Sequence, residues 1–313
     1  MNGLELSRAF FEEYGLPMLE ERFPALLPFL AAGLFGAGSE CFGYDDTLSR
    51  DHDFEPRFCL FLPGENLVNR RDAFLLERAY ASLPRSFRGF SRSLMQPVGG
   101  ARHGVLRTEE FFLRMTGSGD GKLDLSQWLS IPEQALAEAT NGELYFDRLG
   151  EVTRIREALA YFPEDVRVKR LAGHLLLMAQ AGQYNYLRCI RHGESAAAQM
   201  AVFTFVKSTL SAVFLLNRRY QPYYKWGFRA LRDLPLLSSL SVSLERLIST
   251  GNDSGAAEEK AGMIEETAAA VIEQLQIQDL SLAGGRELER HAYSVNDRIR
   301  DPSLRNMHIL TAV

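Results

Sequence analysis

Two short motifs in the first quarter of the sequence contain residue types that could perform chemistry. Gly38-Ser39 lies among small residues, and Asp51 and Asp53 follow it after eleven further residues. Two carboxylates two positions apart on an extended segment point to the same face, because strand side chains alternate. Both can then bind one hard cation, and Mg²⁺ prefers oxygen ligands and commonly joins protein carboxylates to substrate phosphates.

The Gly38-Ser39 turn offers what a triphosphate needs beside such a metal. Glycine lets the backbone approach a phosphate closely, amides at a helix start face the anion, and the serine hydroxyl donates a further hydrogen bond. Each motif alone is common in turns and strand entrances. Together, one short helix apart, they favour in-line phosphoryl or nucleotidyl transfer, in which divalent ions stabilise the attacking and leaving oxygens.

The elements around these motifs are predicted from the spacing of apolar residues. Runs of strand length occur at 31–36, 57–62 and 104–107, and helical spacing occurs at 40–44, at 65–83 and after residue 107. From residue 154 onward almost every segment is predicted to be helical. The ranges are 154–161, 164–181, 184–191, 194–219, 223–232, 236–250, 255–278 and 286–300.

The sequence also resembles a known group of proteins. Gly38-Ser39 followed by Asp51-x-Asp53 is similar to the signature of the polymerase-beta-like nucleotidyltransferase superfamily. The longer stretch GAGSECFGYDDTLSRDHDFEPRF resembles bacterial proteins that contain domain of unknown function 4037. This similarity extends over roughly residues 30 to 235. Further matches are Trp128-Leu129 with Pro132, TNGE at 140–143, LAYFP at 159–163, GQYNYLR at 182–188 and YQPYYKW at 220–226.

The resemblance implies an α+β fold with a nucleotidyltransferase-like mixed sheet and flanking helices, followed by an all-helical domain. We predict domains at residues 1–150 and 151–313. It also implies a nucleoside triphosphate, Mg²⁺ or Mn²⁺ as cofactor, and a small acceptor held by the helical domain. Asp51 and Asp53 would be the metal-binding, catalytic acids, and Gly38 and Ser39 would bind the triphosphate.

The third acid of the superfamily is missing from its expected place. Members commonly carry it on a neighbouring strand, and the candidate strand here, 103–107, contains no carboxylate. Glu109, Glu110 and Asp124 lie beyond that strand. Either the third ligand comes from elsewhere, or the protein binds nucleotide without efficient transfer. The alternative to a transferase is therefore a nucleotide-binding regulatory or interaction module with a decayed active site.

Five further side chains are weaker candidates for the site. Arg57 could neutralise a phosphate or form a salt bridge, and His103 could contact a substrate or serve the structure. Tyr223 and Tyr224 have rings with one polar end, which suits a substrate pocket as well as it suits anchoring in the core. Lys225, between them and a tryptophan, would bind the nucleotide from a helix start, or lie on an ordinary surface.

Composition excludes several other classes of protein. With 35 basic and 40 acidic residues the formal net charge is −5, which argues against a strongly cationic nucleic-acid binder. Three scattered cysteines suggest neither a disulfide framework nor a zinc site, and fit a cytoplasmic compartment.

The N-terminal residues do not have the pattern of a signal peptide. The apolar stretch 196–216 contains Lys207 near its middle and is predicted to be a buried helix rather than a membrane span.

Overall fold

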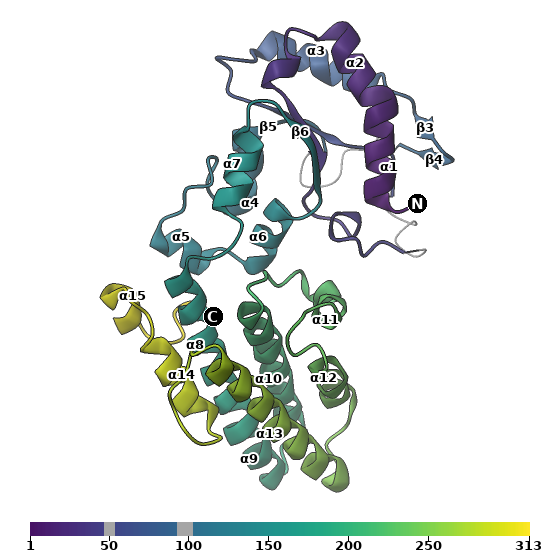
Figure 1. Cartoon of the computed structure of the whole chain (residues 1–313). Helices are drawn as coiled ribbons and strands as arrows, with labels where there is room; N and C mark the ends of the chain where they lie inside the picture. Colours follow the sequence, from purple (N-terminus) through teal and green to yellow (C-terminus); the bar gives the residue numbers. More distant parts are fainter. Residues whose placement is uncertain (47–53, 93–102) are drawn as a thin grey trace. The chain divides into compact units, whose positions relative to one another are not determined.

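The chain divides into two compact units. The computed structural model describes residues 1–46, 54–92 and 103–313 (Figure 1). Unit 1 comprises residues 1–124 and 131–160, and unit 2 comprises residues 125–130 and 161–313. The predicted boundary after residue 150 falls inside unit 1, just before α7 (Glu151–Ala158). That the two units are separate domains stays a prediction.

Unit 1 is built around a mixed four-stranded sheet with the order β5-β2-β1-β6. β1 (Ala31–Leu34) pairs antiparallel with both β2 (Cys59–Leu62) and β6 (Glu143–Asp147), whereas β2 pairs parallel with β5 (Gly104–Arg107). All residues of β1 and β2 are buried. A strand that is covered on both faces consists of consecutive apolar residues. These two strands could therefore be predicted from the sequence.

The two faces of the sheet pack against different helices (Figure 1). Leu60 and Leu62 join a core cluster with residues of α1 (Gly3–Phe10) and α3 (Arg70–Ala81). On the other face, the ring of Phe61 lies 5.2 Å from that of Phe111, measured between centroids. The remaining helices of unit 1 are α2 (Leu16–Arg22), α4 (Thr108–Thr116), α6 (Glu133–Thr140) and α7.

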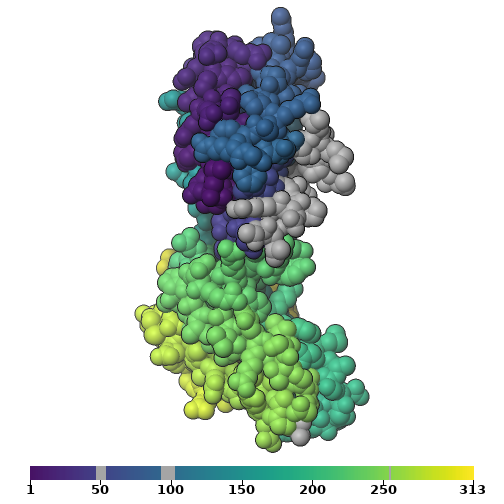
Figure 2. All heavy atoms as spheres, turned by 90° about the vertical axis from the view of Figure 1, so that its right-hand side faces the viewer, coloured from purple at the N-terminus to yellow at the C-terminus, as the bar shows by residue number. Residues whose placement is uncertain are grey.

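A small hairpin packs beside the first helix. It consists of β3 (Ser86–Phe87) and β4 (Phe90–Ser91), and the rings of Phe10 and Phe87 are 5.4 Å apart between centroids. Figures 1 and 2 show this hairpin next to α1. The Phe10–Phe87 contact joins the hairpin to the core of unit 1.

Unit 2 is helical, so the predicted α+β class, with a mixed sheet, flanking helices and a following helical region, is confirmed. Its two central helices are α8 (Glu164–Met178) and α10 (Ser195–Leu216). Around them lie α5 (Leu125–Ser130), α9 (Leu187–Arg191), α11 (Tyr224–Arg232), α12 (Leu240–Ser249), α13 (Ser254–Ile277), α14 (Leu288–Asn296) and α15 (Pro302–Asn306).

The helix α10 is long and apolar enough, by length and composition, to cross a membrane, and among the described residues no other helix is. In its most apolar window 67% of the residues are buried inside the structure. This burial is what the sequence analysis expects of a core helix. A cytoplasmic location stays a prediction.

Two local features differ from the sequence-based prediction. Residues 143–147 form strand β6, which was not predicted, because its residues are all only half-buried and carry acids at both ends. Residues 182–183 were predicted to separate two helices. Instead Ala179–Tyr186 forms a π-helix, η5, that joins α8 to α9 without a break.

A half-buried histidine in α8, whose Nδ1 atom is shielded from solvent, is expected to make unit 2 sensitive to acid. Burial, followed by the charges of Arg170 and Lys207, lowers the pKa of His174 from its ordinary 6.5 to about 3. The unfolded chain therefore takes up this proton first as the pH falls below 6.5. We expect the free energy of unfolding to decrease by about 1.4 kcal/mol per pH unit below that value from this residue alone.

The measurement is urea unfolding of wild type and His174→Gln at pH 7, 6 and 5. The free energy of unfolding of wild type should fall more than that of His174→Gln as the pH is lowered. His192→Gln, at an exposed histidine, is the control and should follow wild type. A difference that is constant over this range would contradict the prediction.

Candidate functional site

The predicted Gly38-Ser39 turn begins where strand β1 ends. Gly36 and Gly38 have φ angles of +122° and +137°, a region that side chains with a Cβ rarely adopt. These two glycines turn the backbone sharply into a three-residue 3₁₀-helix, η3 (Glu40–Phe42). The Ser39 hydroxyl makes no hydrogen bond to another residue in the described part of the chain.

Both ends of this turn are fixed by residues 141 and 142. The side chain of Asn141 accepts a hydrogen bond from the Gly36 amide and donates one to the Gly36 carbonyl, both at 2.9 Å. The Gly142 amide donates to the Cys41 carbonyl at 2.9 Å. The Gly36 amide is thus already used, and a phosphate would have to be bound by the amides that follow it.

A buried network of charged groups links the turn to the segment before β2. The Arg57 guanidinium lies 2.6 Å from a Glu40 carboxylate oxygen and 3.4 Å from one of Glu55. The same Glu55 oxygen lies 3.3 Å from Nε2 of His103. A Cβ added to Gly38 would stand 2.6 Å from both carboxylate oxygens of Glu40. Glu40 thus lies beside the turn, and Arg57 and Glu55 link it in a chain of contacts to His103.

The structure thus brings together four of the predicted site residues, namely Gly38, Ser39, Arg57 and His103. The connecting acids, Glu40 and Glu55, were not predicted. Their side chains are 11% and 8% exposed, which is unusual for glutamate. The available signal was their position, because Glu40 directly follows the Gly-Ser pair and Glu55 closely follows the Asp-x-Asp motif.

The predicted metal ligands Asp51 and Asp53 lie outside the described residues. Within the described ranges no group of three histidine, cysteine or acidic side chains could hold a metal ion. The carboxylates of the Asp-x-Asp motif are hard oxygen donors and so fit Mg²⁺ or Mn²⁺ by their chemistry. That these ions bind here stays a prediction.

Two cysteines close to the site are not candidate nucleophiles. Cys41 lies in η3 and Cys59 in β2, and both are buried. Burial raises the pKa of the Cys41 thiol well above its usual value and that of Cys59 to about 12. Both thiols therefore stay protonated near neutral pH, whereas a nucleophile must be a thiolate.

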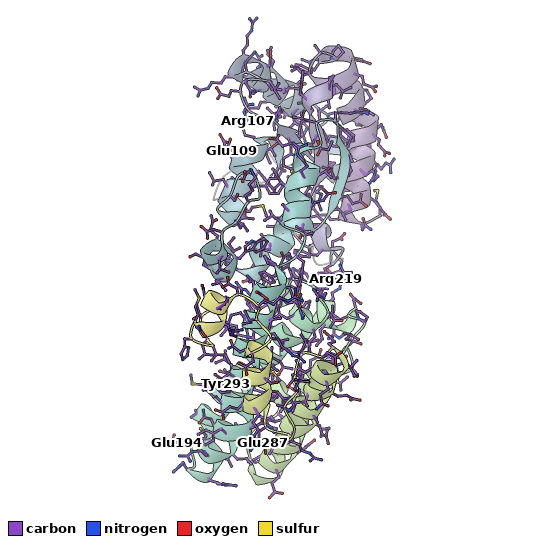
Figure 3. The ribbon with its side chains drawn as sticks, turned by 60° about the vertical axis from the view of Figure 1, so that its left-hand side comes forward. Arg107, Glu109, Glu194, Arg219, Glu287 and Tyr293 are labelled. Atoms are coloured by element: carbon purple, nitrogen blue, oxygen red, sulfur yellow. The ribbon has the colours of Figure 1, made fainter. Side chains whose placement is uncertain are left out.

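The structure places no acid on β5, in agreement with its sequence. Arg107 ends the strand and Glu109 lies in the first turn of α4 (Figure 3). The Arg107 guanidinium donates to the carbonyls of Pro63 and Val68 at 2.6 and 2.7 Å. Arg107 thus holds the loop that follows β2 through these two hydrogen bonds. The strand contributes no carboxylate that could be a third metal ligand.

The three candidates in unit 2 lie at the start of α11. Tyr223 and Tyr224 are 41% and 76% exposed, and their ring centroids are 4.3 Å apart. The ammonium group of Lys225 lies 4.9 Å from the ring centroid of Trp226. These residues form an exposed aromatic surface with one cation. Their roles in binding nucleotide or substrate stay predictions.

Replacing Asn141 by alanine should loosen the turn. The variant loses two hydrogen bonds to Gly36, each worth about 0.5–1.5 kcal/mol, so we expect a loss of about 1–3 kcal/mol in the free energy of unfolding. Urea unfolding measures this, with Asn306→Ala at an exposed asparagine as the control. Equal stability of the two variants would show that Asn141 does not fix the turn.

Comparison with known proteins adds a family match for part of the chain. Residues 128–227 match the model of the Domain of unknown function (DUF4037). The predicted resemblance to proteins containing this domain is confirmed over that range, which includes Tyr223, Tyr224 and Lys225 but not the Gly38-Ser39 turn. No curated protein is significantly similar to the chain.

One solved structure resembles the chain over most of its length. It is the crystal structure of a nucleotidyltransferase-like protein from Exiguobacterium sibiricum 255-15. The identity is 11%, the TM-score is 0.38, and the match covers 93% of this chain and 81% of that one. At this identity and TM-score the similarity assigns no activity to the chain.

Proposed function

We propose that the protein is a Mg²⁺-dependent nucleotidyltransferase that moves a nucleoside monophosphate from a nucleoside triphosphate to a small acceptor. The observation that supports this most is the buried ion pair between Glu40 and Arg57. Glu40 directly follows the Gly38-Ser39 turn, and Arg57 comes four residues after Asp53. A short tertiary contact thus joins a residue that directly follows the Gly38-Ser39 turn to a residue that follows the Asp-x-Asp motif in the sequence.

In this proposal each residue of the site has a defined task. The amides that follow Gly36 and the Ser39 hydroxyl bind the triphosphate tail, since backbone donors in a fixed turn bind anions well. Asp51 and Asp53 hold the cation, which when bound neutralises charge on the phosphates. Arg57 positions the turn through Glu40.

A second function is a nucleotide-binding module without transfer activity. The absence of a carboxylate on β5 favours it, since no acid on that strand could complete the metal site or act as a base. Binding of the triphosphate would be kept under this alternative, and release of pyrophosphate would be lost.

Thermal unfolding with each of the four ribonucleoside triphosphates, with and without Mg²⁺, tests the proposal. A ligand at one hundred times its dissociation constant stabilises the folded chain by about 2.7 kcal/mol. We expect a Mg²⁺-dependent rise in melting temperature with at least one triphosphate, and none with Mg²⁺ alone. No shift with any of them would exclude both functions.

Product analysis then separates the two functions. The protein is incubated with Mg²⁺, labelled triphosphate and a panel of small hydroxyl- and amine-bearing acceptors. Transfer of the labelled monophosphate together with pyrophosphate release supports the enzyme. Triphosphate binding without either product supports the binding module.

A further inference from the structure

The GQYNYLR stretch at 182–188 has no task in the proposed function, and it begins inside the π-helix η5. A Cβ added to Gly182 would stand 2.4 Å from a ring carbon of Phe205 on α10 and 2.9 Å from Ile264 on α13. Glycine at this position therefore lets η5 pack closely against both helices. π-helical segments within α-helices often occur at functional sites.

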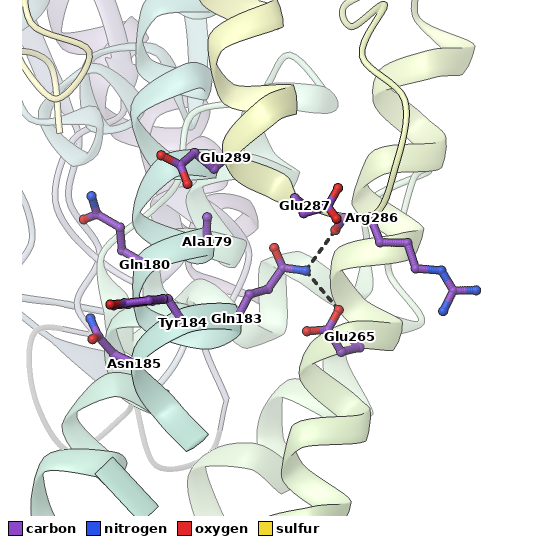
Figure 4. Close-up of a pocket in the computed structure, with 9 residues that line it drawn as sticks. All are labelled: Ala179, Gln180, Gln183, Tyr184, Asn185, Glu265, Arg286, Glu287 and Glu289. Atoms are coloured by element: carbon purple, nitrogen blue, oxygen red, sulfur yellow. Dashed lines mark hydrogen bonds between the residues drawn. The ribbon is translucent and has the colours of Figure 1, made fainter. Parts of the chain in front are cut away.

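Five residues of η5 line a cavity of about 660 Å³ that lies entirely within unit 2 (Figure 4). This volume is within the range of about 300–1,000 Å³ that is typical of small-molecule sites. Figure 3 shows Glu287, one of its lining residues, at the start of α14. The lining residues are Ala179, Gln180, Gln183, Tyr184, Asn185, Glu265, Arg286, Glu287 and Glu289.

Gln183 holds the cavity in shape. Its amide nitrogen donates to a carboxylate oxygen of Glu265 and to the carbonyl of Arg286, and its amide oxygen accepts from the amide of Leu288, all at 2.9 Å. These three bonds join η5 to α13 and to the start of α14, as the dashed lines in Figure 4 show in part. The floor of the cavity is therefore formed before any ligand arrives.

The charge of the lining is negative. It contains three glutamates and one arginine, and in Figure 4 the Arg286 guanidinium points away from the cavity. Within the described part of the chain, Glu289 and the amides of Gln180 and Asn185 make no side-chain hydrogen bond or ion pair. The cavity thus presents carboxylate and amide oxygens that have no other partner there.

An aromatic ring adds a further surface that is suited to a cation. Tyr184 is 60% exposed, and the guanidinium carbon of Arg188 already lies 5.0 Å from its ring centroid. The face of an aromatic ring attracts ammonium and guanidinium groups. The carboxylates and amide oxygens of this cavity can accept the hydrogen bonds of an ammonium group, and the tyrosine ring can attract its charge.

We propose that this cavity binds a small organic cation with primary ammonium groups, such as a linear polyamine. An ammonium group has three hydrogen-bond donors and no acceptor, which matches Glu289, Glu265 and the neighbouring amide oxygens. The hydrocarbon stem would lie against Ala179 and the Tyr184 ring. This site is separate from the proposed function, because it shares no residue with the proposed nucleotide site.

Titration calorimetry of the full chain with spermidine at low salt tests the proposal. We expect saturable binding of one spermidine per chain, weakened by added salt because the site is solvent-exposed. Sorbitol, a neutral polyol, should give no binding. Absence of saturable spermidine binding, or sorbitol binding of equal affinity, would overturn the proposal.

Glu289→Gln is the variant of choice, since Glu289 is exposed and its side chain makes no hydrogen bond or ion pair with the described residues. We expect it to weaken spermidine binding about fivefold or more, as for loss of a charge-assisted hydrogen bond. Glu273→Gln removes the same charge from an exposed position on α13 outside the cavity, and its affinity should stay within about twofold of wild type. An equal loss of spermidine affinity in both variants would show that only the net charge of the chain matters, and it would overturn the proposed site.

The outcome is independent of the proposed nucleotide site. Triphosphate affinity should be the same in Glu289→Gln and wild type. If spermidine does not bind, the proposed nucleotide site is unaffected. If no triphosphate binds, the spermidine titration still tests the cavity.

Discussion

Replacing Asp51 or Asp53 by asparagine is expected to abolish Mg²⁺-dependent triphosphate binding while the chain stays folded. The amide keeps the size of the side chain but loses the negative charge that a hard cation requires. We expect the affinity to fall at least about a hundredfold, which corresponds to about 2.7 kcal/mol. Titration calorimetry with the triphosphate that gives the largest thermal shift, with and without Mg²⁺, measures this.

The control for this experiment is an acid of the same unit that no motif includes. Glu77→Gln on α3, at an exposed position, should bind the triphosphate as wild type does. Circular dichroism of both aspartate variants verifies that they fold. Unchanged Mg²⁺-dependent affinity in both of them would exclude the Asp-x-Asp motif as the metal site. A Mg²⁺-dependent shift that survives in only one variant would assign the cation to the other aspartate.

The strands of unit 1 differ in how clearly the sequence indicates them. β1 and β2 are central and fully buried, so their residues form apolar runs that end at glycine or proline. β6 lies at the edge of the sheet and is half-buried throughout. Its only apolar residues are Leu144, Tyr145 and Phe146, which is too short a run to distinguish a strand from a turn between helices.

Most helices of unit 2 match the predicted ranges, but α14 is shorter than its predicted range of 286–300, α15 lies beyond all of them, and the π-helix was not predicted. A glycine within a helical pattern usually signals an end or a break, and Gly182 lies in the gap between the predicted helices 164–181 and 184–191. In the structure its missing Cβ serves close packing against Phe205 instead. That contact joins residues far apart in the sequence, so no local pattern could indicate it.

The candidate site shows the same limit of local patterns. Gly38 and Ser39 were predicted from their types, and the structure adds the torsion angles and the Asn141 contacts that fix the turn. The charged network was not predictable, because Glu40 and Arg57 are seventeen positions apart. A buried ion pair leaves no periodic signal in a sequence.

Replacing Arg57 by alanine is expected to destabilise unit 1 more than any other single change in the network. The guanidinium lies between two buried carboxylates, at 2.6 Å from Glu40 and 3.4 Å from Glu55. Breaking a buried ion pair from one side commonly costs about 3–5 kcal/mol, because the charge that stays behind has lost its counter-charge. Urea unfolding of wild type and variant at neutral pH measures the loss.

Two further variants decide whether this loss comes from buried charge. Arg70→Ala removes an arginine that also pairs with a glutamate, at 2.8 Å, but whose side chain is 85% exposed, so its stability should hardly change. The double variant Arg57→Met/Glu40→Gln removes both charges and should recover part of the loss of Arg57→Ala. If Arg57→Ala were as stable as Arg70→Ala, the network would not hold the turn. The Glu40–Arg57 contact would then no longer support the proposed function.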